Sequence, residues 1–268
     1  MLWQYTTNFY INKLFNCLLF IKDGLVSPSI PDRNYPTWVK LGESIMAIQI
    51  RKTGDINANG VKMLVYGHAG SGKTTLCASL PNPIIISAEA GLLSLQGVDL
   101  PYIEVDSMDS LMEAYEFLTI STEAKGYKSI CLDSISEIGE VILGHEKKIN
   151  KDPRAAYGAM QEQLGDVIRS FRDLAGKNVY FTAKCEKSQD ETGRILYAPM
   201  MPGNKTGQAL PYFFDLVMAL RVELDADKNP VRALMTQSDG LWQAKDRSGK
   251  LDTWCDPDLG AIIKKIGG

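Results

Sequence analysis

One short segment limits what this chain can fold into more than any other. Residues 67–75 read Gly-His-Ala-Gly-Ser-Gly-Lys-Thr-Thr, which is the spacing of a phosphate-binding loop. The glycines of such a loop let the backbone curl until successive N–H groups face phosphate oxygens. Lys73 is then placed to reach the β- and γ-phosphates, and the hydroxyl of Thr74 to ligate Mg²⁺. The residues expected to bind the nucleotide are Gly67, His68, Ala69, Gly70, Ser71, Gly72, Lys73, Thr74 and Thr75.

The flanks of this loop follow the order that such a site requires. An apolar run at residues 61–66 predicts a buried strand, and residues 74–80 predict a helix that ends at Pro81. The start of this helix would direct the positive end of its dipole at the same anion. The chain is therefore expected to bind a nucleoside triphosphate with Mg²⁺. It has no Asn-Lys-x-Asp guanine-reading pattern, which favours ATP over GTP.

Composition sets limits on the partners of the chain. The 268 residues carry a net charge of −3, so any contact with nucleic acid must come from local basic segments. The 5 cysteines have no paired spacing, which predicts reduced packing residues of a cytoplasmic protein.

The first part of the chain differs from the rest. Residues 1–45 are expected to form a poorly structured extension, followed by one ATP-binding domain at 46–268. The apolar run at 9–21 is too short and too interrupted to span a membrane. Two explanations stay open: translation begins at Met46, or the extension is a short amphipathic docking segment.

Two carboxylates follow predicted buried strands. Glu89 comes just after the run at 83–87, where a base that activates water would lie next to the phosphates. Asp133 ends the run at 129–133, where a carboxylate would hold Mg²⁺.

The rest of the chain predicts further strands, helices and loops. The other expected strands lie at 102–106, 178–183, 214–223 and 231–236. One helix is expected to start at 107–109, and others are expected at 135–149, 155–175 and 256–266. A basic loop is expected at 146–154, a long loop at 185–207 and a hairpin turn at 225–230.

The order of these landmarks resembles the RecA-type ATPase core. More narrowly, residues 46–266 are similar to phage-encoded, RecA-like ATP-binding proteins, a group that includes single-strand annealing recombinases. The resemblance implies an α/β fold: a twisted, mostly parallel sheet with helices on both faces, extended by an antiparallel hairpin. Chemically, it implies ATP hydrolysis by in-line attack of water.

The resemblance also implies roles for individual residues. Glu89 falls where RecA-type proteins keep their catalytic glutamate, and Lys184 falls where they usually keep a glutamine that senses the γ-phosphate. Lys245 and Arg247 resemble the Lys-x-Arg pair that some RecA-like hexamers insert into the neighbour's ATP site, although a solvated turn is an equal alternative. Such a pair implies a homo-oligomer, either a ring or a filament.

Two basic segments match the DNA-binding loops of RecA-like proteins. The residues concerned are Lys147, Lys148, Lys151, Arg154, Lys187, Arg194 and Lys205. Tyr157 or Tyr197 would stack on the bases of a single strand. The alternative is an ordinary solvated surface, because charged runs usually form one.

The resulting hypothesis is a Mg²⁺-dependent ATPase that acts on single-stranded DNA in phage recombination or annealing, in the host cytoplasm and without a membrane. The rival hypothesis is an ATP-switched assembly module that binds a protein partner. Acidic residues near the basic segments would favour the rival if they neutralise the cations; these are Glu146, Asp152, Glu186, Asp190 and Glu191. A small-molecule kinase is less favoured, since no Arg-rich lid is present.

Overall fold

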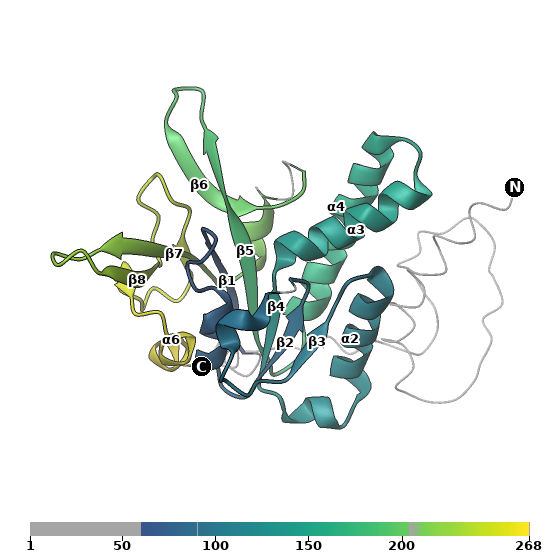
Figure 1. Ribbon diagram of the computed structural model, residues 1–268, viewed down its shortest axis with the longest axis horizontal. Helices are drawn as coiled ribbons and strands as arrows, with labels where there is room; N and C mark the ends of the chain where they lie inside the picture. The colour runs from purple at the N-terminus through teal and green to yellow at the C-terminus, as the bar shows by residue number, and fades with distance from the viewer. Residues whose placement is uncertain (1–59, 90, 204–206, 208, 268) are drawn as a thin grey trace, which may run out of the picture. The chain divides into compact units, whose positions relative to one another are not determined.

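The computed structural model describes residues 60–89, 91–203, 207 and 209–267 (Figure 1). The expected extension at 1–45 and the basic residue Lys205 lie outside these residues. Within them, none of the helices combines the length and the apolar character that a membrane crossing needs.

The elements alternate between strands and helices along most of the chain. The strands are β1 (Lys62–Gly67), β2 (Pro83–Ser87), β3 (Tyr102–Glu104), β4 (Ser129–Asp133), β5 (Asn178–Gln189), β6 (Ile195–Met200), β7 (Leu216–Leu224), β8 (Pro230–Met235), β9 (Lys245–Asp246) and β10 (Trp254–Cys255). The α-helices are α2 (Met108–Ile120), α3 (Ile135–Ile149), α4 (Pro153–Arg172) and α6 (Leu259–Ile266). Short 3₁₀ helices lie at Thr74–Ser79, Leu92–Leu95, Glu123–Gly126 and Leu210–Phe213.

All of these strands join one sheet in the order β10-β8-β7-β1-β5-β4-β2-β3, with β6 paired to β5 and β9 to β7. Neighbours from β7 to β3 run parallel, and β8, β9, β10 and β6 are antiparallel. The predicted α/β fold, with its mostly parallel sheet and antiparallel hairpin, is confirmed.

Helices cover both faces of the sheet, as expected. Leu64 and Tyr66 of β1 pack into a core with α2, α3 and α4, whereas Met63 and Val65 pack on the other face with the 3₁₀ helix Thr74–Ser79 and α6. Successive residues of a strand point to opposite faces, so a strand that is buried on both sides reads as a continuous apolar run. This is why β1, β2 and β4 were visible in the sequence.

Capping residues fix the start of α3 and of α4. Ser134 is the N-cap of α3 and accepts a hydrogen bond from the backbone N–H of Glu137. Asp152 caps α4, where Pro153 occupies the first turn and needs no hydrogen-bond partner for its nitrogen. The predicted bounds of α3 are confirmed, and α4 begins two residues earlier than expected.

Three predictions about local structure were wrong in whole or in part. A helix does follow the phosphate loop, but it is a six-residue 3₁₀ helix, Thr74–Ser79, and not a full α-helix, because Leu80 is already extended and the chain must return for β2. A helix this short does not supply the dipole of a full α-helix. The expected loop at 146–154 is only a three-residue connection between α3 and α4. Most of the expected loop at 185–207 is the β5–β6 hairpin, whose turn contains Gly193 at φ 81°.

Candidate active site

The carboxyl ends of four parallel strands bring the predicted site residues together. In the sheet register Gly67 lies opposite Lys184, and Ser87 lies opposite Asp133. The phosphate loop follows β1, and Glu89 follows β2 by two residues. Residues far apart in the sequence therefore meet at one edge of the sheet, where α/β proteins bind their ligands.

The phosphate loop depends on glycine at particular positions. A Cβ atom at Gly67 would lie 2.7 Å from the carbonyl oxygen of Leu220, which is too close for any side chain. Gly70 and Gly72 have φ angles of 75° and 103°, a region that residues with a side chain rarely adopt. The loop thus has the curled backbone that its sequence predicts.

Lys73 folds back over this loop. Its Nζ donates hydrogen bonds to the carbonyl oxygens of Gly67 and His68, at 3.0 and 3.1 Å. Burial lowers the pKa of the Lys73 ammonium, and the carboxylates of Glu89 and Asp133 act in the opposite direction. The ammonium is thus held at the mouth of the loop, within the field of both predicted catalytic carboxylates.

Asp133 is buried, with 2% of its surface exposed, and both of its oxygens accept hydrogen bonds. The Thr74 hydroxyl donates to Oδ2 at 2.6 Å, and the Thr182 hydroxyl donates to Oδ1 at 2.5 Å. Burial raises the pKa of the Asp133 carboxyl, and the two hydroxyl donors oppose this shift. The carboxylate therefore has a fixed orientation toward the phosphate loop.

The pair Thr74–Asp133 fits a Mg²⁺ ion. Both groups present oxygen, the ligand that Mg²⁺ prefers, and they are already in contact. Mg²⁺ normally keeps several waters and binds through one or two protein groups together with substrate phosphates. The phosphate loop beside Thr74 would provide those phosphates.

Glu89 is tied to the end of β4. Its Oε1 accepts a hydrogen bond from the Ser134 hydroxyl at 2.6 Å, and its backbone N–H donates to the carbonyl oxygen of Asp133 at 3.3 Å. Its carboxylate therefore lies close to both Asp133 and Lys73. This is a suitable position for a residue that orients a water molecule toward a bound γ-phosphate.

Lys184 lies on β5, the strand between β1 and β4, at the point where β5 leaves the parallel sheet. Its Nζ forms a salt bridge with Glu137 of α3. Its backbone N–H donates to the Ser136 hydroxyl at 3.0 Å, and that hydroxyl donates to the carbonyl oxygen of Met200 at 2.7 Å. The structure thus places Lys184 next to the phosphate loop, as predicted, but already paired.

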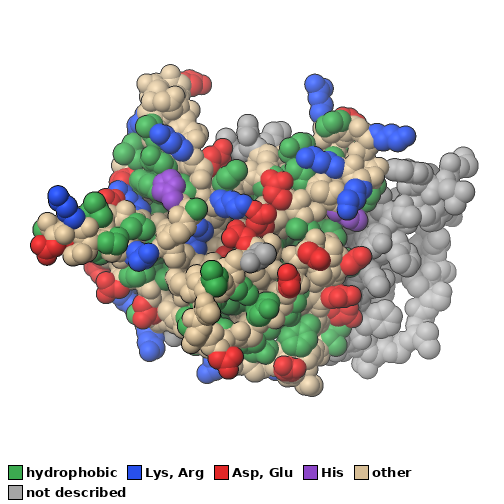
Figure 2. Space-filling model, in the orientation of Figure 1, with side chains coloured by type: hydrophobic (Ala, Val, Ile, Leu, Met, Phe, Trp, Pro, Cys, Tyr) green, Lys and Arg blue, Asp and Glu red, His purple; other side chains and the backbone are tan. Residues whose placement is uncertain are grey.

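The basic residues assigned to DNA fall into two groups. Lys147, Lys148, Lys151 and Arg154 are exposed at the tip where α3 meets α4, and they form no salt bridge with any described residue. In Figure 2, cationic side chains gather at this tip. Lys187 and Arg194 belong to the β5–β6 hairpin, where Arg194 pairs with Asp190.

Lys245 and Arg247 lie away from the phosphate loop of their own chain. Lys245 pairs with Val217 near the start of β7, whereas the loop follows the ends of the parallel strands. The Lys245 Nζ donates to the carbonyl oxygen of Pro211 at 2.5 Å, and Arg247 forms a 3.5 Å ion pair with Asp215. Any role of this pair in hydrolysis would have to be in a neighbouring subunit.

Sequence reasoning missed several residues of the site. Thr182, Ser136 and Glu137 hold the predicted residues but belong to no recognised motif, and Ser134 holds Glu89 although the sequence indicated no such role for it. The only available signal was their position beside Asp133 and Lys184 in the sequence.

An aromatic cluster was also missed: His68 of the phosphate loop contacts Trp242 and Tyr197, whose rings stack with centroids 4.1 Å apart. One face of Tyr197 is therefore not available to a nucleic-acid base.

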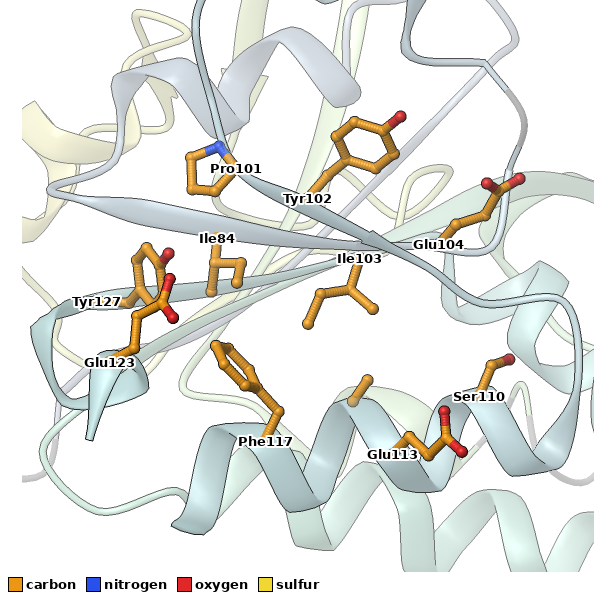
Figure 3. Close-up of a pocket in the computed structure, with 11 residues that line it drawn as sticks. Ile84, Pro101, Tyr102, Ile103, Glu104, Ser110, Glu113, Phe117, Glu123 and Tyr127 are labelled. Atoms are coloured by element: carbon orange, nitrogen blue, oxygen red, sulfur yellow. The ribbon is translucent and has the colours of Figure 1, made fainter. Parts of the chain in front are cut away.

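A cavity among the described residues lies elsewhere. It measures about 400 Å³ and lies between β3, at the edge of the sheet, and α2 (Figure 3). Its lining includes Tyr102, Phe117 and Glu113 but none of the predicted site residues. We assign the active site to the phosphate loop instead, because the chemical groups converge there.

A family model described as an AAA domain matches residues 59–248. Among solved structures, the fold is similar to that of a KaiC-like protein from the hyperthermophilic archaeon Pyrococcus horikoshii, with 13% identity and a TM-score of 0.39. That match covers 66% of this chain and 78% of the other. The curated proteins contain no match.

Proposed function

The chain belongs to the AAA domain family, and we propose that it is a Mg²⁺-dependent ATPase that acts on single-stranded DNA. The observation that carries the ATPase proposal is the 2.6 Å hydrogen bond between Thr74 and Asp133, next to Lys73 and Glu89. Four groups of the expected types thus meet around one phosphate loop. Phosphoryl transfer requires mainly such positioning and charge stabilisation.

Each residue of the site has a definite task in this proposal. The loop N–H groups and Lys73, once released from the carbonyl oxygens of Gly67 and His68, bind the phosphates of ATP. Thr74 and Asp133 would hold Mg²⁺, which when bound neutralises charge on the phosphate oxygens. Glu89 orients the attacking water, and Ser134 holds Glu89 in place.

Support for single-stranded DNA as partner comes from the tip of α3 and α4. Its four cations have no acidic partner among the described residues, and Glu146 points instead to Gln163 and Asn150. In Figure 1 this tip and the β5–β6 hairpin project on the same side of the sheet. A single strand of DNA bound between the tip and the hairpin would pass close to the phosphate loop. This path would couple DNA binding to ATP hydrolysis in phage recombination or annealing.

The hairpin favours the second candidate function, an ATP-switched assembly module. The β5–β6 segment is ordered by its own backbone pairing, and Asp190 neutralises Arg194. An ordered hairpin joined to Lys184 could bind a protein partner and report the nucleotide state to it.

In either function the active form would be a ring or a filament, with Lys245 and Arg247 completing a neighbour's site.

ATP turnover with and without single-stranded DNA, measured over a range of salt, tests the choice. The DNA proposal predicts stimulation by DNA and an affinity for DNA that falls steeply with salt. The triple variant Lys147→Ala, Lys148→Ala, Lys151→Ala should lose most of the stimulation and lower the salt slope by about 2, at roughly 0.7 for each phosphate contact. Its matched control is Lys125→Ala with Lys128→Ala, two exposed lysines at the opposite end of β4. Turnover indifferent to DNA in the wild type would instead favour the assembly module.

A further inference from the structure

The site residues define the direction in which a bound nucleotide lies. Asp133, Glu89 and Lys184 come from β4, β2 and β5, which all lie on the same side of β1 in the sheet. These groups act on Mg²⁺ and on the β- and γ-phosphates. The nucleoside end of the ligand therefore points to the other side of β1, where β7 and β8 lie (Figure 1).

An arginine from β8 occupies that side of the phosphate loop. The Arg232 Nε donates a hydrogen bond to the carbonyl oxygen of Ser71 at 2.9 Å, across 161 positions of sequence. The Arg232 side chain also borders Gly72, where an added Cβ would lie 3.4 Å from Nε. Arg232 is exposed, and within the described part of the chain it forms no salt bridge and its two terminal nitrogens donate no hydrogen bond.

This contact places Arg232 on the outer wall of the loop. A phosphate-binding loop directs its N–H groups inward to the anion, so that a carbonyl oxygen such as that of Ser71 faces outward. Arg232 binds this carbonyl and so flanks the phosphates rather than entering their cradle. The next part of the ligand along that direction is the ribose and base. A guanidinium is planar and stacks well on aromatic rings.

We propose that Arg232 binds the nucleoside end of the nucleotide, with its guanidinium packed against the purine base. The inference rests on the proposed function, because it takes ATP as the ligand of the phosphate loop. It assigns to this chain a base-binding residue that no sequence motif indicated. The β7–β8 hairpin thereby becomes part of the nucleotide site, and the hydrogen bond from Arg232 to Ser71 joins it to the phosphate loop.

Three ligands separate base binding from simple support of the loop. Binding of Mg²⁺·ATP, Mg²⁺·GTP and Mg²⁺·tripolyphosphate is measured by calorimetry for the wild type, Arg232→Ala and Arg232→Lys. Tripolyphosphate has the phosphates but no nucleoside. Lys264→Ala, an exposed cation on α6, is the matched control, and thermal melting checks that each variant folds.

Arg232→Ala should weaken ATP binding roughly 5- to 30-fold, the range from a strong exposed cation–π contact to a desolvated one, and change tripolyphosphate binding less than about twofold. Arg232→Lys keeps the positive charge but loses the planar guanidinium, so its affinity for ATP should lie between those of the wild type and Arg232→Ala. Equal loss for ATP and tripolyphosphate would overturn the inference and leave Arg232 as a support of the loop. So would unchanged ATP binding. If the wild type binds none of the three ligands, the proposed ATPase function fails. If the wild type binds ATP and only the Arg232 variants depart from expectation, the inference about Arg232 fails alone.

Discussion

Lys184 forms a salt bridge with Glu137, and this pair joins the strand beside the phosphate loop to the first turn of α3. Lys184 is opposite Gly67 in the sheet, so its ammonium lies within reach of the site where a γ-phosphate would bind. Both side chains are partly exposed, which makes the pair weak enough to exchange. A γ-phosphate could therefore take Lys184 from Glu137, whereas ADP would leave the pair intact.

Loss of either partner should change the preference for ATP over ADP. We expect Lys184→Met to lower the ratio of ATP affinity to ADP affinity, because it removes the cation that only the triphosphate reaches. Glu137→Gln should raise the same ratio up to about fivefold, the value of an exposed ion pair near 1 kcal/mol. Titration of both nucleotides by calorimetry measures the ratio.

Lys187→Met is the matched control for this pair, since Lys187 is exposed on the same strand but farther from the loop. It should leave the ratio unchanged. A ratio that is the same in Lys184→Met and the wild type would exclude Lys184 as a sensor of the γ-phosphate.

Thr182 is expected to act through the orientation of Asp133. Thr182→Val keeps the side-chain volume but removes the donor to a buried carboxylate oxygen, which should lower the free energy of unfolding by about 1–3 kcal/mol. The same change should weaken Mg²⁺-dependent binding of ATP. Thr236→Val is the control, because the buried Thr236 hydroxyl donates to the carbonyl oxygen of Asp252, away from the site. If both variants weaken ATP binding alike, the effect is one of stability alone.

Ser134 should influence turnover through Glu89. Ser134→Ala removes the 2.6 Å hydrogen bond to Glu89 and also the N-cap of α3. We expect kcat to fall roughly tenfold or more, from loss of a hydrogen bond to a charged group, with little change in KM. Ser107→Ala removes only the N-cap of α2 and should cost about 1 kcal/mol of stability without affecting kcat. An unchanged kcat in Ser134→Ala would mean that Glu89 needs no such support.

Lys62 should make the stability of the fold depend on pH in the alkaline range. Burial lowers the pKa of the Lys62 ammonium to about 8 from an ordinary value near 10.5. Between these values the unfolded chain binds more protons than the folded one, so the free energy of unfolding rises as pH increases from 8 to 10.5. Because the group is partly exposed, we expect a rise of roughly 1–2 kcal/mol. Chemical denaturation across this range should show a smaller rise in Lys62→Met, and an identical rise would rule out Lys62 as its source.

The sequence predicted those parts of the fold that are buried on both sides or capped by a clear signal. β2 and α3 have the predicted bounds, because the apolar run of β2 and the cap at Ser134 are local features. The β5–β6 hairpin was not foreseen, since residues 186–189 of β5 are exposed and lack the alternation of a half-buried strand. The backbone pairing with β6 defines it, and that pairing leaves no apolar pattern.

The site was predictable where a residue type and a motif coincide. Lys73, Thr74, Asp133 and Glu89 meet at one edge of the sheet, as the spacing of the motifs implied. Residues that act on them across the sheet were not predictable: the contact between Thr182 and Asp133 spans 49 positions, and that between Arg232 and Ser71 spans 161. Such contacts arise from strand order, which no single segment of the sequence specifies.

The most direct test of the account measures ATP binding and ATP turnover for the wild type, Lys73→Ala and Glu89→Gln, with Mg²⁺ and with a chelator. We predict that the wild type hydrolyses ATP only with Mg²⁺ and that Lys73→Ala binds ATP weakly. Glu89→Gln should bind ATP like the wild type but fail to turn it over, because its amide cannot accept the proton of the water. Turnover that persists in both variants, or that needs no Mg²⁺, would contradict the account.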